Sequence, residues 1–311
     1  MKERARRGWG AFFALAFAVY TFSVTGDALP LLGLPLAVTL VALPPRRPAH
    51  LLLATLALLF GLAGAPRDSL WQLSRGWALL LGAWFVVGLL LVPRATLTGR
   101  ALLATAASAL TAALLMLVRP GAMQGVDLAL ASQLRSLAQQ NLAVWRATGA
   151  KLPPELVDTM NRLPDIGSFL APALMGLASM AALGVAWWVY RRLVVGDQPP
   201  LAPLREFRFR DDLVWLLVAG IVLVLVPWIG HGAMRAGSNI VMFMGALYAL
   251  RGLAVLVALA GGALGFGGAL LALLAALSIL PLATAATALV GLTDTWLDIR
   301  ARMAAPPGPA K

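Results

Sequence analysis

The chain contains about eight or nine apolar segments, each long enough to cross the hydrocarbon core of a bilayer. They leave little sequence for anything else. Of the 311 residues, 60% are hydrophobic and 12% are charged, so the polar surface that a soluble domain of this size needs is missing. The sequence therefore predicts an all-α fold, a polytopic transmembrane helical bundle.

We place the spans at about 9–25, 28–43, 49–65, 75–92, 101–118, 166–190, 213–230, 239–260 and 267–297. The segment 28–43 is short for a bilayer and contains Pro30 and Pro35, so crossing and re-entry both stay open. Residues 1–311 are treated as one integral membrane domain. Its parts are N-terminal helices over 9–118, an outer amphipathic helical loop over 119–165, C-terminal helices over 166–300 and a flexible tail over 301–311.

The net charge of +12 is spread in short basic groups at the ends of apolar segments, not gathered on one domain. This is the pattern of cytoplasmic loops, so we expect no nucleic-acid partner. The loop 191–212 holds five arginines and is predicted to be cytoplasmic, as is the N-terminus. The expected location is the bacterial inner membrane. Counting spans forward puts the C-terminus outside, against its own basic residues, so the side of the C-terminus stays open.

The loop 119–165 carries its own helical pattern. An apolar stripe with helical spacing predicts a first helix, and Pro153-Pro154-Glu155 predicts the start of a second, short one. Asp165 and Ser168 are placed as caps of the next span. The stripe consists of Val126, Leu130, Leu134, Leu137 and Trp145. Both helices are expected outside the cytoplasm, either flat on the membrane surface or folded over the bundle as a lid.

The sequence contains no recognisable group of catalytic residues, so we do not expect an enzyme. We also predict no metal ligands and no cofactor. The chain has no cysteine and two histidines without metal-ligand spacing. The informative polar residues lie in the last third. Arg251 falls about twelve residues into an apolar run, where an arginine needs a partner or a water-filled cavity. The candidate substrate-binding residues are Asn239, Tyr248, Arg251 and Asp294.

Each of these residues has a structural alternative. Arg251 could form a structural ion pair, or lie near the interface if its helix starts elsewhere. Asp294 could pair with Arg251 if their helices are antiparallel, or sit on a solvated helix end beside Asp298, which can reach Arg302. Asn239 could cap its helix. A second set in the cytoplasmic loop is a candidate contact for a protein partner or anionic lipid, namely Arg205, Phe207, Arg208, Phe209 and Arg210.

Several stretches resemble the YybS-like family of uncharacterised bacterial inner-membrane proteins. They are the 119–165 loop, the segment 204–215, Gly237-Ser238-Asn239, the segment 247–253 and the closing pattern 291–300. That family is distantly similar to the membrane-embedded substrate-binding subunits of energy-coupling-factor vitamin transporters. Such a relationship implies binding of a vitamin-like ligand and docking through small-residue helix faces, for which Gly10, Ala14 and Ala18 would be suited.

Two functions remain for the bundle in its lipid bilayer. The first is binding or transport of a small, vitamin-like or anionic molecule, which predicts an internal cavity lined by Arg251. The second is a membrane scaffold or assembly factor that docks a membrane protein partner through the loop 191–212. The second predicts an Arg251 satisfied within the protein and sensitivity concentrated at Arg205, Phe207, Arg208 and Phe209.

Overall fold

The computed structural model describes residues 30–44, 69–118, 121–149, 153–196, 204–226, 230–259 and 281–304, with isolated positions between 48 and 59 and at 228. Every regular element in these ranges is helical, which confirms the predicted fold class. The chain divides into two compact units, residues 1–199 and 200–311, a boundary that the sequence pattern did not suggest. The predicted span 9–25, with the small-residue face of Gly10, Ala14 and Ala18, lies outside the described residues, as do most of 49–65 and the first part of 267–297.

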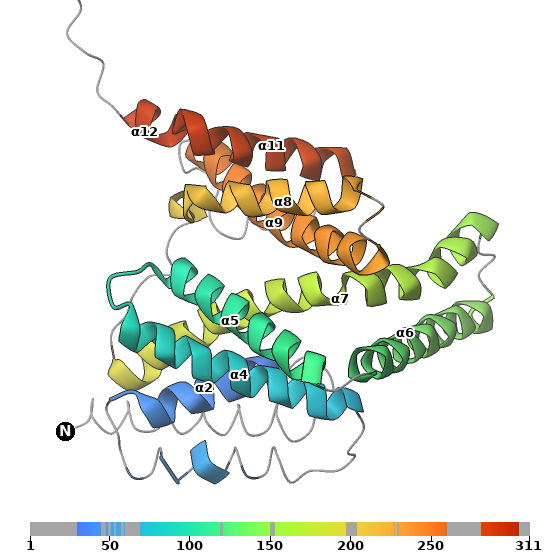
Figure 1. The fold of residues 1–311 in the computed structure, drawn as a ribbon, viewed down its shortest axis with the longest axis horizontal. Helices are drawn as coiled ribbons and strands as arrows, with labels where there is room; N and C mark the ends of the chain where they lie inside the picture. The colour runs from blue at the N-terminus through green and yellow to red at the C-terminus, as the bar shows by residue number, and fades with distance from the viewer. Residues whose placement is uncertain are drawn as a thin grey trace, which may run out of the picture. The chain divides into compact units, whose positions relative to one another are not determined.

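Unit 1 is built on four apolar helices packed side by side (Figure 1). They are α2 (Pro30–Ala42), α4 (Ser69–Leu91), α5 (Leu97–Val118) and α7 (Pro154–Val189), and a π-helical turn, Tyr190–Val195, continues α7. Leu40, Leu81, Phe85 and Leu183 are buried between them. A Cβ at Gly82 would lie 3.0 Å from the Cα of Pro35, so this glycine lets α2 and α4 approach closely.

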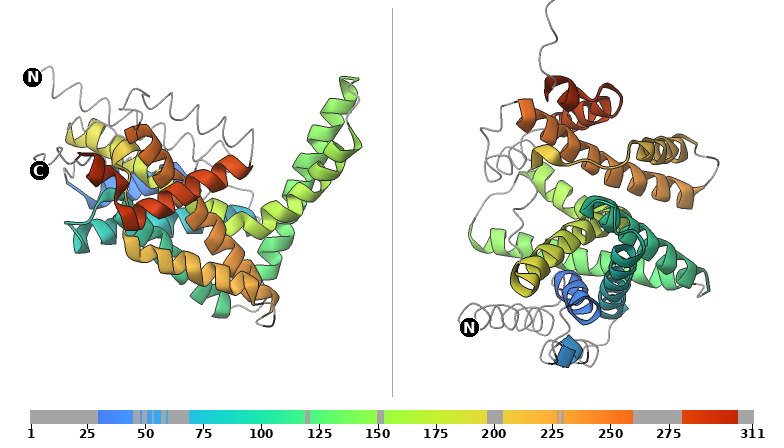
Figure 2. Two further views of the ribbon diagram at one scale, coloured as in Figure 1. Left: turned by 90° about the horizontal axis from the view of Figure 1, so that it is seen from above. Right: turned by 90° about the vertical axis from the view of Figure 1, so that its left-hand side faces the viewer.

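The predicted outer loop folds as one arm of unit 1, formed by α6 (Ala122–Ala147) and the first part of α7. Pro154 is at the first turn of its helix, as predicted, but the short second helix does not end before the next span. Instead α7 continues through Pro164 and Pro172 for 36 residues, a length of about 54 Å against about 30 Å of hydrocarbon. Figure 2 shows the arm projecting away from the other helices of unit 1.

Asp165 and Ser168 therefore do not cap a helix, because both lie inside α7. The Asp165 carboxylate accepts a hydrogen bond from Arg135 of α6 at 2.7 Å, and Leu134 packs 3.1 Å from where a Cβ of Gly167 would be. The apolar stripe predicted for α6 is only partly covered, since Leu137 and Trp145 are 46% and 51% exposed. Whether the arm lies on the membrane or covers the bundle stays a prediction.

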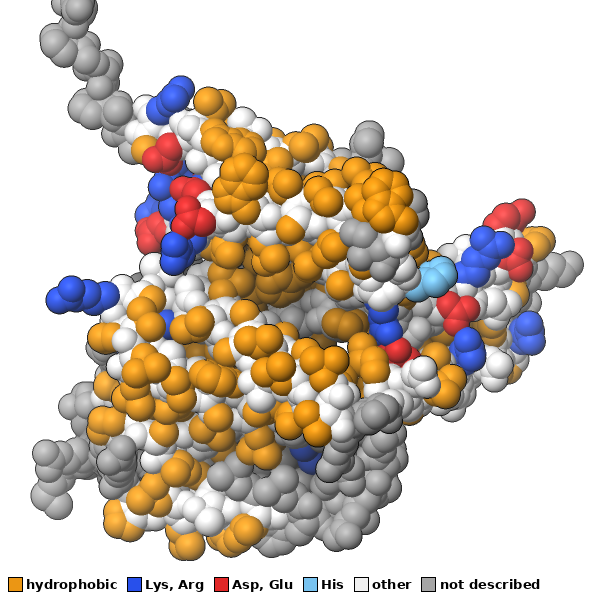
Figure 3. All heavy atoms as spheres, viewed as in Figure 1, with side chains coloured by type: hydrophobic (Ala, Val, Ile, Leu, Met, Phe, Trp, Pro, Cys, Tyr) orange, Lys and Arg blue, Asp and Glu red, His pale blue; other side chains and the backbone are white. Residues whose placement is uncertain are grey.

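Four helices of the described residues are long and apolar enough to cross a membrane. These are Leu73–Leu91, Leu97–Val118, Pro154–Arg192 and His231–Leu259, and Leu31–Ala42 is a shorter apolar helix. Figure 3 shows apolar side chains over much of the visible surface of both units, while charged side chains gather on the arm and at one end of unit 2. This distribution is expected when lipid, not water, covers the helices.

Unit 2 contains η2 (Leu204–Glu206), η3 (Asp211–Leu213), α8 (Val214–Leu225), α9 (His231–Leu259), α11 (Pro281–Leu297) and α12 (Ile299–Ala304). α9 packs against α8 on one side and α11 on the other (Figure 1). Both contacts use glycine. Gly220 and Gly237 face each other between α8 and α9, and Gly252 and Gly291 do so between α9 and α11. Small residues at such crossings let helix backbones touch.

Two boundaries in unit 2 differ from prediction. α9 begins at His231, eight residues before the predicted span, because the 231–238 stretch contains no helix-breaking proline and simply extends the helix. α12 extends helix to Ala304, four residues into the predicted flexible tail. Arg300 bonds the carbonyls of Arg205 and Phe207, so the C-terminal end lies on the same side as segment 204–213.

Candidate functional site

The most concentrated polar structure of unit 2 surrounds Arg251, whose guanidinium is 3% exposed. Its Nε donates to Asp294 Oδ2 at 3.0 Å, and its Nη2 donates to the Asp294 carbonyl oxygen at 3.3 Å. Its Nη1 donates to Asp211 Oδ1 at 2.6 Å. All three guanidinium nitrogens are therefore engaged by carboxylate or backbone oxygens of the protein itself.

Arg300 binds the same carboxylate from the other side. Its Nη2 lies 2.7 Å from Asp294 Oδ2, and its Nη1 donates to the carbonyls of Arg205 and Phe207 at 2.9 and 3.0 Å. The Asp294 side chain is fully buried between the two arginines. We call these four residues, Asp211, Arg251, Asp294 and Arg300, the charge cluster. It fastens segment 204–213 to the ends of α9 and α11.

Aromatic rings cover one side of the charge cluster. Phe209 is buried, and its ring lies 5.5 Å from the guanidinium carbon of Arg251 and 5.1 Å from the ring of Tyr248. Phe207 meets Phe209 edge-on at 6.1 Å. A guanidinium over an aromatic face gains electrostatic attraction, and the ring excludes water from it. The Tyr248 hydroxyl, Asp294 Oδ1 and Arg300 Nε are buried without a hydrogen-bond partner among the described residues.

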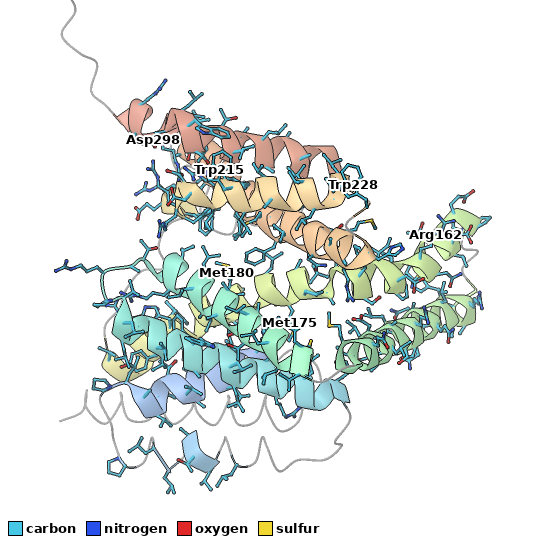
Figure 4. All side chains as sticks on the ribbon, viewed as in Figure 1. Arg162, Met175, Met180, Trp215, Trp228 and Asp298 are labelled. Atoms are coloured by element: carbon cyan, nitrogen blue, oxygen red, sulfur yellow. The ribbon has the colours of Figure 1, made fainter. Side chains whose placement is uncertain are left out.

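Two exposed tryptophans lie close in sequence to members of the charge cluster. Asp211 is four residues before Trp215, which is 72% exposed, and Trp296 beside Asp294 is 65% exposed. Exposed tryptophans are typical of the membrane–water interface. Figure 4 shows Trp215 and Trp228 at the two ends of α8, with Asp298 beyond the end of α11. Because α9 starts eight residues before the predicted span, Arg251 lies 20 residues after the first residue of its helix.

The structure brings together three of the four predicted substrate-binding residues, Tyr248, Arg251 and Asp294. The ion pair of Arg251 with Asp294 forms where α9 and α11 cross, next to the contacts of Gly252 with Thr287 and of Gly291 with Tyr248. Asn239 lies apart, about 18 Å along α9 from Arg251. It is inside the helix and does not cap it, and its Nδ2 donates to the Arg235 carbonyl at 2.9 Å.

The predicted partner-contact residues divide into held and outward-facing ones. Phe209 and the backbone of Arg205 and Phe207 are held by the charge cluster. The Arg208 side chain is half-exposed and pairs with Asp298 at 2.6 Å. Arg210, with its side chain 82% exposed, pairs with Asp212 at 2.6 Å. Acidic and basic side chains alternate at this end of unit 2 (Figure 3), so it is mixed in charge and not a basic patch.

Sequence reasoning missed Asp211 and Arg300 as members of the cluster. Arg300 reaches Asp294 because the helix is interrupted at Asp298, whose φ of +42° separates α11 from α12. Aspartate is among the few residues that tolerate this region. Asp298 then pairs with Arg208, not with the side chain of Arg302 as helical spacing suggested. The sequence pattern that could have indicated them is weak. Both residues are charged and border an apolar segment, but many other residues of the chain do so too.

A family model described as "Predicted membrane protein (DUF2232)" matches residues 11–295. The chain belongs to the DUF2232 family of predicted membrane proteins. Neither the curated proteins nor the solved structures contain a match. The description of the DUF2232 family names a membrane location and no activity, so the chemistry must be argued from the residues.

In this DUF2232 protein the charge cluster has the properties of a structural clamp. Ionised pairs with bidentate or shared geometry give strong, directional hydrogen bonds when they are desolvated. No group of three metal-ligating side chains occurs in the part of the chain that the structure describes. The cluster fixes segment 204–213 against α9, α11 and α12.

Proposed function

We propose that this DUF2232 protein is a membrane-embedded docking protein, and that segment 204–213 is the surface that a partner protein recognises. The main observation is that the guanidinium groups of Arg251 and Arg300 donate their hydrogen bonds to this segment and to Asp294. A loop needs no such clamp to connect two helices. A loop held by two buried arginines keeps one conformation, and a preformed surface binds a partner with less loss of conformational entropy.

The chemistry of the surface indicates what kind of partner fits. Arg208 and Arg210 point outward but are paired with Asp298 and Asp212. Attraction to anionic lipid depends on excess positive charge, and local carboxylates offset it here. A protein with complementary mixed charges fits this surface better than a lipid headgroup or a polyanion does. The basic residues of the neighbouring loops favour a cytoplasmic position for this surface.

Site-specific photo-crosslinking in cells tests this role. A crosslinker at Arg210 should give one discrete protein adduct, and the same crosslinker at Trp228, which is exposed at the other end of α8, should not. Arg300→Gln should remove the adduct while the protein remains in the membrane, because the two backbone carbonyls lose their donor. Absence of any adduct from Arg210 in the wild-type chain, or its persistence in Arg300→Gln, would contradict the proposal.

A small-molecule binding or transport role is the second candidate. The observation favouring it is the set of three buried polar atoms without hydrogen-bond partners, on Tyr248, Asp294 and Arg300. Buried polar atoms are normally satisfied, so an unsatisfied group is a place to look for a ligand. The distant resemblance to vitamin-transporter subunits that the sequence motifs suggest would also favour this candidate. Native mass spectrometry should then detect a small molecule on wild type and lose it from Tyr248→Phe; equal spectra from both would count against it.

A further inference from the structure

The buried charges of unit 2 do not balance. Three charged side chains among its described residues are less than a tenth exposed, namely Arg251, Asp294 and Arg300. Two are cations and one is an anion, so the buried set carries one excess positive charge. Removing a guanidinium from water is costly unless an anion compensates it. The fold therefore requires one more negative group at this place.

The compensating group is Asp211, and it differs from Asp294 in an important respect. Asp294 is fully buried, whereas the Asp211 side chain is 60% exposed and meets Arg251 through a single oxygen, Oδ1, at 2.6 Å. Asp211 also sits on a three-residue turn, η3, not within a long helix. Solvent can thus reach the carboxylate that neutralises a buried guanidinium. A solute oxyanion can reach the same place.

The surroundings restrict what kind of anion can replace Asp211. Phe209 covers the face of the Arg251 guanidinium at 5.5 Å, and Asp294 occupies its Nε edge. The Nη1 edge is the one that meets an exposed side chain, that of Asp211. The adjacent Asp212 has its side chain 74% exposed, and its carboxylate opposes additional negative charge nearby. A singly charged carboxylate or phosphate group fits these limits, and a polyanion does not.

We infer that Arg251 is an anion-binding site that Asp211 fills in the free protein, and that the carboxylate or phosphate group of a small solute exchanges with Asp211. This inference gives the binding candidate above a ligand class and rests on it, but it does not depend on docking. Exchange releases η3 from Arg251 while Arg300 still holds the carbonyls of Arg205 and Phe207. The released segment includes Asp212, which offers a reporter position.

The first test is chemical replacement of the missing carboxylate. Full-length wild type, Asp211→Asn and the neighbouring control Asp212→Asn are purified in uncharged detergent. Thermal unfolding is followed while sodium acetate or sodium phosphate replaces sodium chloride at constant ionic strength. Asp211→Asn should unfold at a lower temperature in chloride and be restored by acetate or phosphate. The oxyanion concentration for half restoration should be about tenfold or more below that needed to shift wild type, because a tethered competitor is gone.

The control Asp212→Asn should respond as wild type does. If Asp211→Asn is destabilised but chloride restores it as well as oxyanions do, or nothing restores it, Asp211 is a fixed structural counter-ion and the inference is wrong. The phosphate of an anionic lipid is a second source of the same group. Reconstitution of Asp211→Asn in phosphatidylcholine with and without phosphatidylglycerol separates the sources, since a lipid site is filled without added solute.

A second measurement avoids destabilising the protein. The chain has no cysteine, so Asp212→Cys places a single thiol beside η3 in a background that keeps Asp211. Phosphate or acetate should increase the rate of maleimide labelling over chloride at equal ionic strength, because exchange frees this turn. An unchanged rate overturns the inference. A co-purifying neutral ligand found by mass spectrometry, together with an unchanged rate, would keep the binding role and remove only the anion site.

Discussion

Replacement of Gly252 by alanine is the sharpest test of how the site is built. A Cβ at Gly252 would lie 1.8 Å from the Thr287 carbonyl oxygen and 2.9 Å from the Gly291 nitrogen. Both are backbone atoms of α11, so no side-chain rotation relieves the overlap. Since a Cβ essentially never approaches another heavy atom closer than 3.0 Å, α9 and α11 must separate by at least 1.2 Å, the difference between these distances.

That separation has two costs. Forcing apart a packed crossing costs about 1–3 kcal/mol. The neighbouring Arg251 also moves from Asp294, and a 3.0 Å hydrogen bond stretched by this amount reaches about 4 Å, outside bonding range. A hydrogen bond between charged groups contributes about 1.5–3 kcal/mol. Together the free energy of unfolding should fall by about 3 kcal/mol or more, which corresponds to a Tm lower by about 6–12 °C.

The matched control is Gly245→Ala in the same helix. A Cβ there meets nothing within 4 Å, and alanine favours helix over glycine by about 0.5–1 kcal/mol, so Tm should stay equal or rise slightly. Thermal unfolding of the full chain by circular dichroism in nonionic detergent compares the variants. If Gly252→Ala unfolds within the experimental error of Gly245→Ala, the close crossing of α9 and α11 does not exist and the geometry around Arg251 is wrong.

Three further outcomes are expected. Asp294→Asn should lower the free energy of unfolding by about 3–5 kcal/mol, because two buried arginines lose their shared carboxylate, whereas Asp298→Asn at a half-exposed pair should cost less than about 1 kcal/mol in the same unfolding assay. Gly237→Ala should destabilise by about 1–3 kcal/mol, since its Cβ would lie 2.7 Å from the Gly220 carbonyl oxygen; a Tm equal to wild type contradicts the α8–α9 contact. Arg135→Ala should leave Tm within about 3 °C of wild type, because its partner is exposed.

The fold class was predictable because apolar segment length is a local property. Helices α4, α5 and α9 each contain most of a predicted span. The boundaries were less accurate where local signals conflict with packing. Pro164 and Pro172 suggest an interruption, yet α7 continues through both. Tertiary contacts such as that of Arg135 with Asp165 lie on the stretch where the sequence predicted an end, which agrees with helix stability coming mainly from packing.

The site was half predictable. Arg251 and Asp294 stand out because charges inside apolar runs need partners. Asn239 lies inside α9 and not at its start, so it does not join the charge cluster. The sequence did not indicate Asp211 and Arg300 as site residues. Their role depends on the contact of segment 204–213 with Arg251 and on the left-handed backbone conformation of Asp298. Neither is a repeating pattern that one sequence displays.

By itself, the sequence determined that this protein is helical and lies in a membrane, because backbone groups in lipid must be satisfied within each helix and apolar length alone selects such segments. It also identified Arg251 as a residue that needs a partner. Only the tertiary structure decided which partners it has. Contacts between α9, α11 and segment 204–213 join residues 40 and 43 positions apart. The close approach of α9 and α11 depends on glycines, because any side chain at the crossing would overlap the other helix. The need for glycine at these positions is visible only once the second helix is packed against the first.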